Sequence, residues 1–279
     1  MHQWQGAEGI AIAGDLWGRA DAPLVVLLHG GGQTRHAWKG VGRALGAAGF
    51  RAVALDARGH GDSGWSPTGD YSTDAMVEDL RLVVSALGAA RVAMVGASMG
   101  GGVSLVASGE NAVDASAVVL VDMAPKIEME GVVKIQDFMR QKPEGFDSLE
   151  EVAEAVASYQ PHRPRKHDHS GLAKNVRLGA DGRYKWHWDP RFLPTPDKVL
   201  ARAKRFEDCS RRITAPMLLV RGGLSDVVSE EGVRRFLELR PEAEYVNVGG
   251  AGHMVAGDRN DVFGQAVIDF LSRKLKDLR

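Results

Sequence analysis

The sequence predicts an α/β protein built on a mostly parallel, doubly wound sheet. Short aliphatic runs recur along the chain, amphipathic stretches lie between them, and glycine-rich turns follow several of the runs. Runs that are apolar on both faces are typical of strands in a parallel sheet that is covered by helices on both sides. Right-handed crossovers would stack these strands into one open sheet.

The expected elements follow in chain order. Gly9 to Gly18 resembles an antiparallel hairpin that leads into the sheet. Thr73 to Leu87, Ser229 to Leu239 and Asp261 to Leu275 repeat apolar residues at helical steps, so we expect helices there. Six aliphatic runs are expected as buried strands: Leu24 to Leu28, Arg51 to Leu55, Arg91 to Val95, Ala117 to Val121, Met217 to Val220 and Tyr245 to Val248.

The alternation breaks from Ala124 to Ile213. The strand signal vanishes there, prolines are frequent, and 18 Lys+Arg stand against 14 Asp+Glu, whereas the rest of the chain has 17 against 22. We therefore expect a modestly basic inserted cap subdomain at residues 124–212, in a core formed by residues 1–123 and 213–279.

Composition and charge exclude several classes of protein. The 279 residues include 35 Lys+Arg and 36 Asp+Glu with interspersed signs, which offers no basic stripe for a nucleic acid. The N-terminus lacks the pattern of a signal peptide, and the longest aliphatic run is far shorter than the ~20 residues of a membrane helix. A single cysteine, Cys209, is compatible with a reducing compartment. We expect a cytoplasmic protein with a small-molecule substrate, without nucleic-acid or membrane partners; its oligomeric state stays open.

Ser98 is the candidate nucleophile. It lies in Gly96-Ala97-Ser98-Met99-Gly100, between a predicted strand and a helix-compatible stretch. A serine on so sharp a turn needs glycines two residues before and two after, because a Cβ there would meet neighbouring backbone. An ordinary glycine-rich turn is the alternative, and the strand-helix context favours the nucleophile.

A second glycine-rich loop, His29-Gly30-Gly31-Gly32, follows the run Leu24 to Leu28. Backbone amides in such a loop can approach an oxyanion, and the residue after the nucleophile supplies another amide. We assign this pair to Gly31 and Met99. His29 is expected to hold the loop by hydrogen bonds rather than to transfer protons.

A serine nucleophile needs a base and a carboxylate that orients it. His253 follows the last predicted strand, and Asp226 follows the strand before it, so the order serine, acid, histidine is Ser98, Asp226, His253. Asp122, at the end of Ala117 to Val121, is the alternative acid. Asp258 is expected to cap the last helix or to stay solvated.

Other residues receive weaker assignments. Gly30, Gly32, His36 and Trp186 are candidate substrate contacts, although an exposed helical histidine is the simpler interpretation of His36. The turn Asp56 to Ser63 is expected to be structural, with Asp56 and Arg58 paired locally. The four histidines of the insertion lack the spacing of a metal site, so we expect neither a metal nor a cofactor; they are His162, His167, His169 and His187.

The landmarks together resemble the α/β-hydrolase superfamily, over nearly the whole chain outside the insertion. They are the HGGG at His29, the D-x-R-G-H-G-x-S at Asp56 to Ser63, the GASMGG at Gly96 to Gly101, the Asp226 loop and Gly252-His253. The resemblance implies an eight-stranded, mostly parallel sheet with an antiparallel second strand, and a helical cap after the sixth strand. It is closest to the esterase, epoxide-hydrolase-like and cofactor-free haloperoxidase-like group. True epoxide hydrolases have an aspartate as the nucleophile at this turn, whereas the serine at position 98 fits attack on a carbonyl carbon.

The predicted function is therefore that of a serine hydrolase. Ser98 would form an acyl-enzyme with a carboxylic ester or a similarly activated carbonyl compound. One alternative is cleavage of a carbon–carbon bond in a vinylogous diketone, because the basic, tryptophan-containing cap could hold an anionic aromatic substrate. A ligand-binding protein with vestigial turnover is the other alternative.

Overall fold

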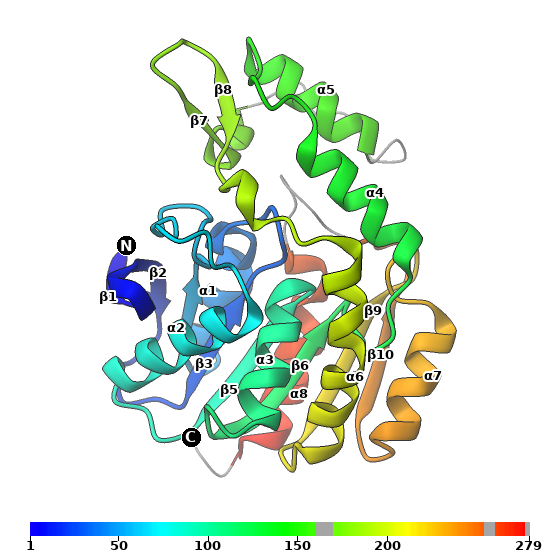
Figure 1. Cartoon of the computed structure of the whole chain (residues 1–279). Coiled ribbons are helices and arrows are strands. Elements are labelled where there is room, and N and C mark those ends of the chain that lie inside the picture. Colours follow the sequence, from blue (N-terminus) through cyan, green and yellow to red (C-terminus); the bar gives the residue numbers. More distant parts are fainter. Residues whose placement is uncertain (160–169, 254–259, 277–279) are drawn as a thin grey trace.

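An eight-stranded sheet and the helices on its two faces form the body of the protein (Figure 1). The computed structural model describes residues 1–159, 170–253 and 260–276. In this part of the chain the strands of the large sheet are β1 (His2–Gln5), β2 (Ala11–Trp17), β3 (Leu24–Leu28), β4 (Arg51–Leu55), β5 (Val92–Ala97), β6 (Ala115–Val121), β9 (Met217–Gly222) and β10 (Glu244–Val248).

The helices and a small second sheet complete the described fold. The helices are α1 (Lys39–Ala47), α2 (Thr73–Ala86), α3 (Met99–Gly109), α4 (Met129–Arg140), α5 (Leu149–Tyr159), α6 (Pro196–Arg212), α7 (Glu230–Leu239) and α8 (Gly264–Lys274). The small sheet pairs β7 (Val176–Leu178) with β8 (Tyr184–Trp186) in antiparallel fashion.

The large sheet has the order β1-β2-β4-β3-β5-β6-β9-β10. β2 is antiparallel to both of its neighbours, and the remaining pairs are parallel. The predicted α/β-hydrolase sheet, with eight strands and an antiparallel second strand, is thus confirmed. The six predicted strands and three predicted helices are present, with ends that differ by at most a few residues; the last helical stretch begins as a single 3₁₀ turn at Asn260–Phe263. The hairpin expected at Gly9 to Gly18 is wrong in its bounds, because this segment holds only β2, and its antiparallel partner β1 precedes it at His2–Gln5.

The strand register brings several loops to one level. Leu28, the last residue of β3, pairs with Leu55 at the end of β4 and with Gly96 near the end of β5. Ala97 pairs with Val121, so β5 and β6 also end together. The loops that follow these four strands therefore lie side by side at the carboxyl edge of the sheet, where open α/β folds place their ligands.

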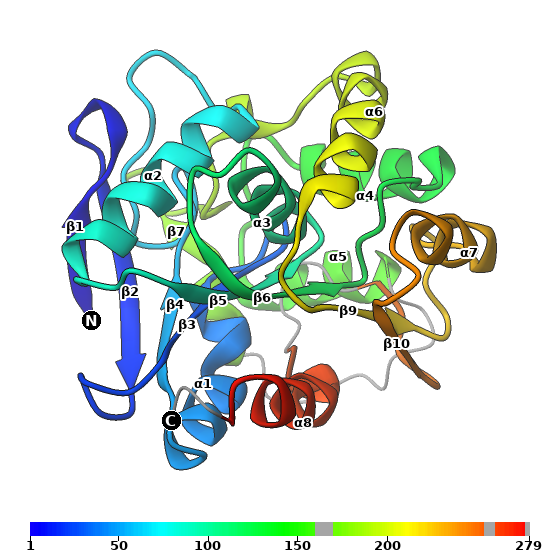
Figure 2. The ribbon, with the colours of Figure 1, turned by 90° about the horizontal axis from the view of Figure 1, so that it is seen from below.

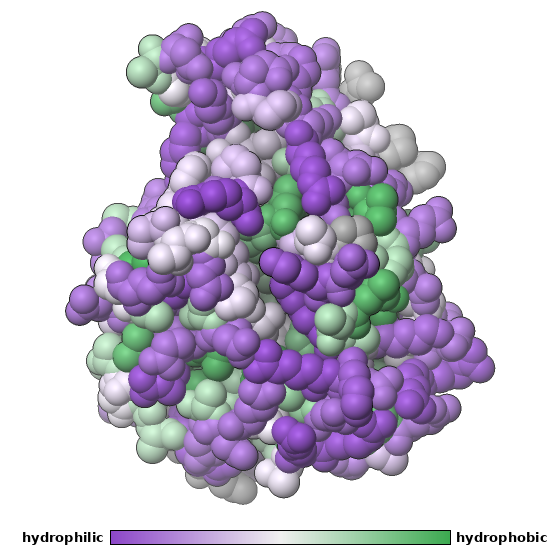
Figure 3. Space-filling view, viewed as in Figure 1, coloured by the Kyte–Doolittle hydropathy of each residue, from purple (hydrophilic) through white to green (hydrophobic). Residues whose placement is uncertain are grey.

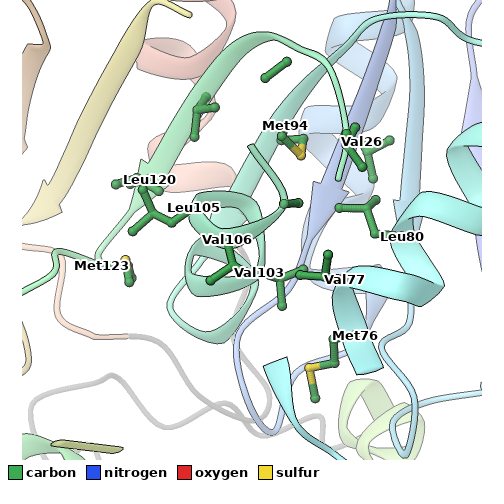
Figure 4. Close-up of a cluster of buried hydrophobic side chains, with 14 of the residues drawn as sticks. Val26, Met76, Val77, Leu80, Met94, Val103, Leu105, Val106, Leu120 and Met123 are labelled. Carbon is green, nitrogen blue, oxygen red and sulfur yellow. The ribbon is translucent and has the colours of Figure 1, made fainter. Parts of the chain in front are cut away.

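Two apolar layers hold the sheet between its helices. α1 and α8 cover one face, and α2, α3 and α6 lie over the other (Figure 2). Figure 4 shows the second layer, in which Val26, Met94 and Leu120 of the sheet face Leu80 of α2 and Val103 of α3. Complete burial of each such side chain contributes ~1.5–3 kcal/mol.

The segment between β6 and β9 has two parts. α4, α5, β7 and β8 share an apolar cluster of their own, which includes Phe138, Phe146 and Trp188; we call this part the cap, and Figure 1 shows it above the carboxyl edge of the sheet. α6 instead packs along α3, where Gly109 leaves space for Cys209. That residues 124–212 form one inserted subdomain stays a prediction.

Candidate active site

Ser98 sits on a strained turn between β5 and α3. Its φ of 45° and ψ of −110° are values that residues with a side chain rarely adopt. A Cβ on Gly96 would lie 2.2 Å from the carbonyl oxygen of Gly100, and one on Gly100 would lie 2.5 Å from that of Leu28. The G-x-S-x-G spacing is therefore a packing requirement of this turn, and Ser98 lines a cavity.

His253 lies against a carboxylate at the carboxyl edge of the sheet. Its Nδ1 is 2.6 Å from Oδ2 of Asp122, and both side chains are buried. Asp122 directly follows β6 and has a φ of 49°. Its carboxylate also accepts hydrogen bonds from the Gly222 amide, at 3.1 Å, and from the Ser225 hydroxyl, at 2.9 Å. These donors hold the carboxylate in place beside the imidazole.

The prediction that Asp226 orients His253 is wrong in this structure. Asp226 is partly exposed, 3.1 Å from Nζ of Lys134 on α4. The sheet order explains the difference, because β6 is the direct neighbour of β5 whereas β9 lies one strand further from Ser98. The loop after β9 supports the site in another way, since its Gly222 and Ser225 bind Asp122.

The glycine-rich loop after β3 lies beside the serine. A Cβ on Gly30 would be 3.5 Å from Cβ of Ser98, and Gly31, Met99 and Ser98 line the same cavity. Met99 is the first residue of α3, so its amide has no partner within the helix. The assignment of an oxyanion hole to Gly31 and Met99 is compatible with this arrangement and stays a prediction.

Three buried histidines brace the loops around this site: His29, His60 and His187, which we call the histidine cluster. The ring centroids of His29 and His60 are 5.2 Å apart, and those of His60 and His187 are 5.7 Å apart. His187 follows β8 of the cap and bonds to Gly61 and Gly32, so the cluster links the cap to the loops after β4 and β3. The expectation that His29 holds its loop by hydrogen bonds is confirmed.

Each ring of the histidine cluster accepts one backbone hydrogen bond. Nε2 of His29 accepts from Ala57 at 3.0 Å, Nε2 of His60 from Gly32 at 3.3 Å, and Nδ1 of His187 from Gly61 at 2.8 Å. A nitrogen that accepts carries no proton, so the three rings are neutral. Burial lowers the pKa of all three, to about 3 for His187 and well below the ordinary value for His60.

The turn after β4 is structural, but its ion pairs differ from those expected. Asp56 binds the backbone amide and the guanidinium of Arg35 instead of Arg58. Arg58 pairs with Asp79 at 2.6 Å and with Glu8 at 2.8 Å. The turn is thereby tied to the start of the chain and to α2.

A cavity of about 160 Å³ lies over Ser98 and His253. Its volume corresponds to on the order of ten water molecules, enough for a small-molecule ligand. Hydrophobic groups show in a hollow between the cap and the body (Figure 3). Apolar side chains dominate the lining: Met76, Val103, Met123, Ile135, Met139, Phe192, Leu193, Val199 and Phe206 among others. Its polar members outside the serine and histidine region are Thr73, Gln136 and Arg202, together with Tyr71.

The predicted substrate contacts are placed differently. Gly30 adjoins Ser98, but the backbone of Gly30 and Gly32 is bound to Gln33 and to the histidine cluster, and neither lines the cavity. His36 lies away from the cavity, near Asp15. Trp186 stacks on Trp188 with ring centroids 4.7 Å apart, inside the apolar cluster of the cap. None of the four predicted contacts, Gly30, Gly32, His36 and Trp186, therefore lines the cavity.

Other expectations concern metals and membranes. Among residues 1–159, 170–253 and 260–276, no group of three or more His, Cys, Asp or Glu side chains could hold a metal ion. His162, His167, His169 and Asp258 lie outside these described ranges. No helix in the described part of the chain is long and apolar enough to cross a membrane.

The position of Asp122 had a signal in the sequence. It ends the strand that follows the serine turn, and sequential strands of a parallel sheet are frequently neighbours. The choice between Asp122 and Asp226 as the partner of His253 depended on whether β6 or β9 lies next to β5. Arg202, which also lines the cavity, had no comparable signal. It belongs to α6, which lies in the segment where the alternation of strands and helices breaks.

Comparison with known proteins identifies the family. The model of the alpha/beta hydrolase fold family matches residues 23–259. The esterase Rv0045c of Mycobacterium tuberculosis is 30% identical over 264 residues, which cover 89% of this chain and 82% of that protein. A 2-(acetamidomethylene)succinate hydrolase of Mesorhizobium japonicum is 27% identical over 228 residues, which cover 80% of this chain and 78% of that protein.

Solved structures agree with this result. A crystal structure of E-2-(acetamidomethylene)succinate hydrolase superposes with a TM-score of 0.82 at 23% identity, over 99% of this chain and 98% of that one. The matched region includes Ser98, Asp122 and His253, and the sheet has the topology of the family. The chain belongs to the α/β-hydrolase fold family and is a hydrolase of that family.

Proposed function

We propose that this protein is a serine hydrolase that cleaves carboxylic esters through an acyl-enzyme on Ser98. The observation that carries the proposal is the strained serine turn in a cavity that also contains a histidine hydrogen-bonded to a buried carboxylate. This is the arrangement that turns an inert hydroxyl into a nucleophile. The similarity to an esterase over 89% of the chain supports the same class of substrate.

Each residue then has a defined task. Nδ1 of His253 donates to Asp122, so the lone pair of the ring is on Nε2, which removes the proton of Ser98 as Oγ attacks the carbonyl carbon. The amides of Gly31 and Met99 stabilise the oxyanion. The alcohol leaves with the proton from His253, and water then hydrolyses the acyl-enzyme by the same steps. Asp122 keeps the imidazole in its tautomer and stabilises the imidazolium.

Carbon–carbon bond cleavage uses the same three residues and is the second candidate. The sequence favours it through a basic, tryptophan-containing cap that would hold an anionic aromatic substrate. Trp186 and Trp188 instead lie in the apolar cluster of the cap, so the ester is the better supported substrate. Assays with a p-nitrophenyl ester and with a vinylogous diketone, run side by side, separate the two reactions.

The decisive variant is Ser98→Ala. We expect kcat for a p-nitrophenyl ester to fall by roughly 10⁴- to 10⁶-fold, since the nucleophile is lost while the fold is kept. A fluorophosphonate should label the natural protein on Ser98 and leave the variant unlabelled. Full turnover by the variant would refute the proposal, and absence of labelling in the natural protein would favour a ligand-binding role.

A further inference from the structure

Arg202 is a cation in the lining of the mainly apolar cavity over Ser98. It lies on α6, and Val199, Ala203 and Phe206 of the same helix line the cavity with it. Among the described lining residues it is the only lysine or arginine. A single charge among apolar groups is the arrangement by which ligand sites fix orientation and specificity.

The charges next to Arg202 are already engaged. Arg205, one turn further along α6, binds Glu110 through Nε and Nη2 at 2.7 Å each, and Asp74 through Nη2 at 2.5 Å. Asp74 therefore acts on Arg202 only from a distance, while its carboxylate is bound elsewhere. The Arg202 side chain itself forms no hydrogen bond or ion pair with another residue in the described part of the chain.

The environment disfavours the charge of Arg202. It is half-buried, and burial together with the like charge of Arg205 lowers its pKa. An arginine keeps its charge in proteins despite such a shift. A partly desolvated guanidinium without a carboxylate partner gains from an anion, above all from a carboxylate that fits its planar fork.

Thr73, at the start of α2, is a second polar residue of the cavity lining. It is buried, lines the same cavity, and is the first residue of a 14-residue helix. The hydroxyl can donate a hydrogen bond, and the N-terminal turn of a helix favours negative charge. Arg202 and Thr73 thus line one cavity with groups suited to an anion, and the bond between Asp74 and Arg205 joins the start of α2 to α6.

We propose that Arg202 binds a carboxylate at the far end of the substrate, so that the substrate class is an ester with a free carboxylate separated from the scissile carbonyl by an apolar chain. This inference rests on the proposed ester hydrolysis at Ser98 and extends it to specificity. The apolar lining receives the chain, and Arg202 recognises the charged end.

The test compares anionic and neutral esters of matched length. One series is the monomethyl esters of dicarboxylic acids from succinate to suberate, and another is the acetyl esters of ω-hydroxy acids; the methyl-esterified form of each compound is the neutral counterpart. The measured quantity is the ratio of kcat/KM for the anionic ester to that for the neutral one, in the natural protein and in Arg202→Met.

Arg202→Met should lower this ratio about 10- to 100-fold, which corresponds to the loss of a hydrogen-bonded charge partner. Turnover of the neutral esters should stay within about threefold of the natural value, and Arg202→Lys should restore part of the ratio. Lys198→Met removes one charge from an exposed position of the same helix and should leave the ratio unchanged. An unchanged ratio in Arg202→Met, in both series, overturns the inference.

A binding measurement separates this inference from the proposed reaction. Calorimetric titration of suberate and adipate into Ser98→Ala and into Ser98→Ala/Arg202→Met does not need turnover. Binding that is lost in the double variant supports the carboxylate site even if every ester assay fails, in which case ester hydrolysis alone is refuted. Ester turnover with neither dicarboxylate binding nor an Arg202-dependent ratio refutes the carboxylate site alone.

Discussion

In the described part of the chain, four buried histidines lie near the carboxyl edge of the sheet, and their partners divide them into two kinds. His253 donates to the carboxylate of Asp122. The histidine cluster of His29, His60 and His187 bonds to backbone amides and carbonyls instead. A carboxylate stabilises an imidazolium, whereas an amide donor requires a neutral ring. The same residue type is therefore suited to proton transfer at one position and to bracing loops at three others.

The largest expected effect comes from removing the carboxylate that distinguishes His253. In Asp122→Asn we expect kcat for a p-nitrophenyl ester to fall by about 10⁴-fold, because the amide would favour the wrong tautomer and could not stabilise the imidazolium. Steady-state kinetics on the purified variant measure the loss.

Asp226→Asn is the matched control for this variant. It makes the same chemical change on the neighbouring strand end, but Asp226 is partly exposed and pairs with Lys134. Its kcat should stay within about twofold of the natural value, because surface changes away from special features have small effects. A reversed order of the two losses would restore Asp226 as the orienting acid.

The next effect concerns the histidine cluster and pH. The folded pKa values of these rings are lowered, to about 3 for His187, whereas an unfolded histidine titrates near ~6.5. Between those values the unfolded chain binds more protons, so stability is complete above ~6.5 and falls as the pH decreases. Each neutral ring should contribute a slope of up to ~1.4 kcal/mol per pH unit in this window.

His187→Asn tests how much the ring of His187 contributes to the pH dependence of the unfolding free energy. The amide oxygen can still accept from Gly61, but the side chain no longer titrates. Urea unfolding from pH 4 to 7 should show a shallower decrease of the unfolding free energy toward low pH than in the natural protein. His2→Asn, at an exposed position of β1, should keep the natural slope. Equal slopes for natural protein and His187→Asn would show that the cluster does not resist protonation.

The smallest of these effects is expected from Ser225→Ala. Its hydroxyl donates to Asp122 at 2.9 Å, one of three donors to that carboxylate. Loss of one hydrogen bond to a charged group should reduce kcat/KM by about tenfold or less, far less than Asp122→Asn. Ser229→Ala, which removes an N-cap of α7 rather than a contact to Asp122, should leave kcat/KM unchanged and lower only stability. A loss as large as that of Asp122→Asn would mean that Ser225 itself takes part in proton transfer.

The sequence alone determined the sheet, the serine turn and the loop beside it. Periodicity identifies strands and helices because the residues of one buried face recur at fixed steps along the chain. Gly96 and Gly100 mark a turn whose tight backbone contacts exclude any side chain. The histidine of the last loop could be chosen in the same way, since chain order restricts the candidates.

Tertiary structure decided which carboxylate lies beside His253 and which cation lines the cavity. Asp122 and Asp226 both follow buried strands, and only the order β5-β6-β9 shows that Asp122 lies next to the serine turn. Arg202 comes from the segment that breaks the strand pattern, and its position depends on the packing of α6 along α3. Hydrogen bonds and ion pairs act over a few ångströms between residues far apart in the chain, so the partners are known only once the strands and helices are in place.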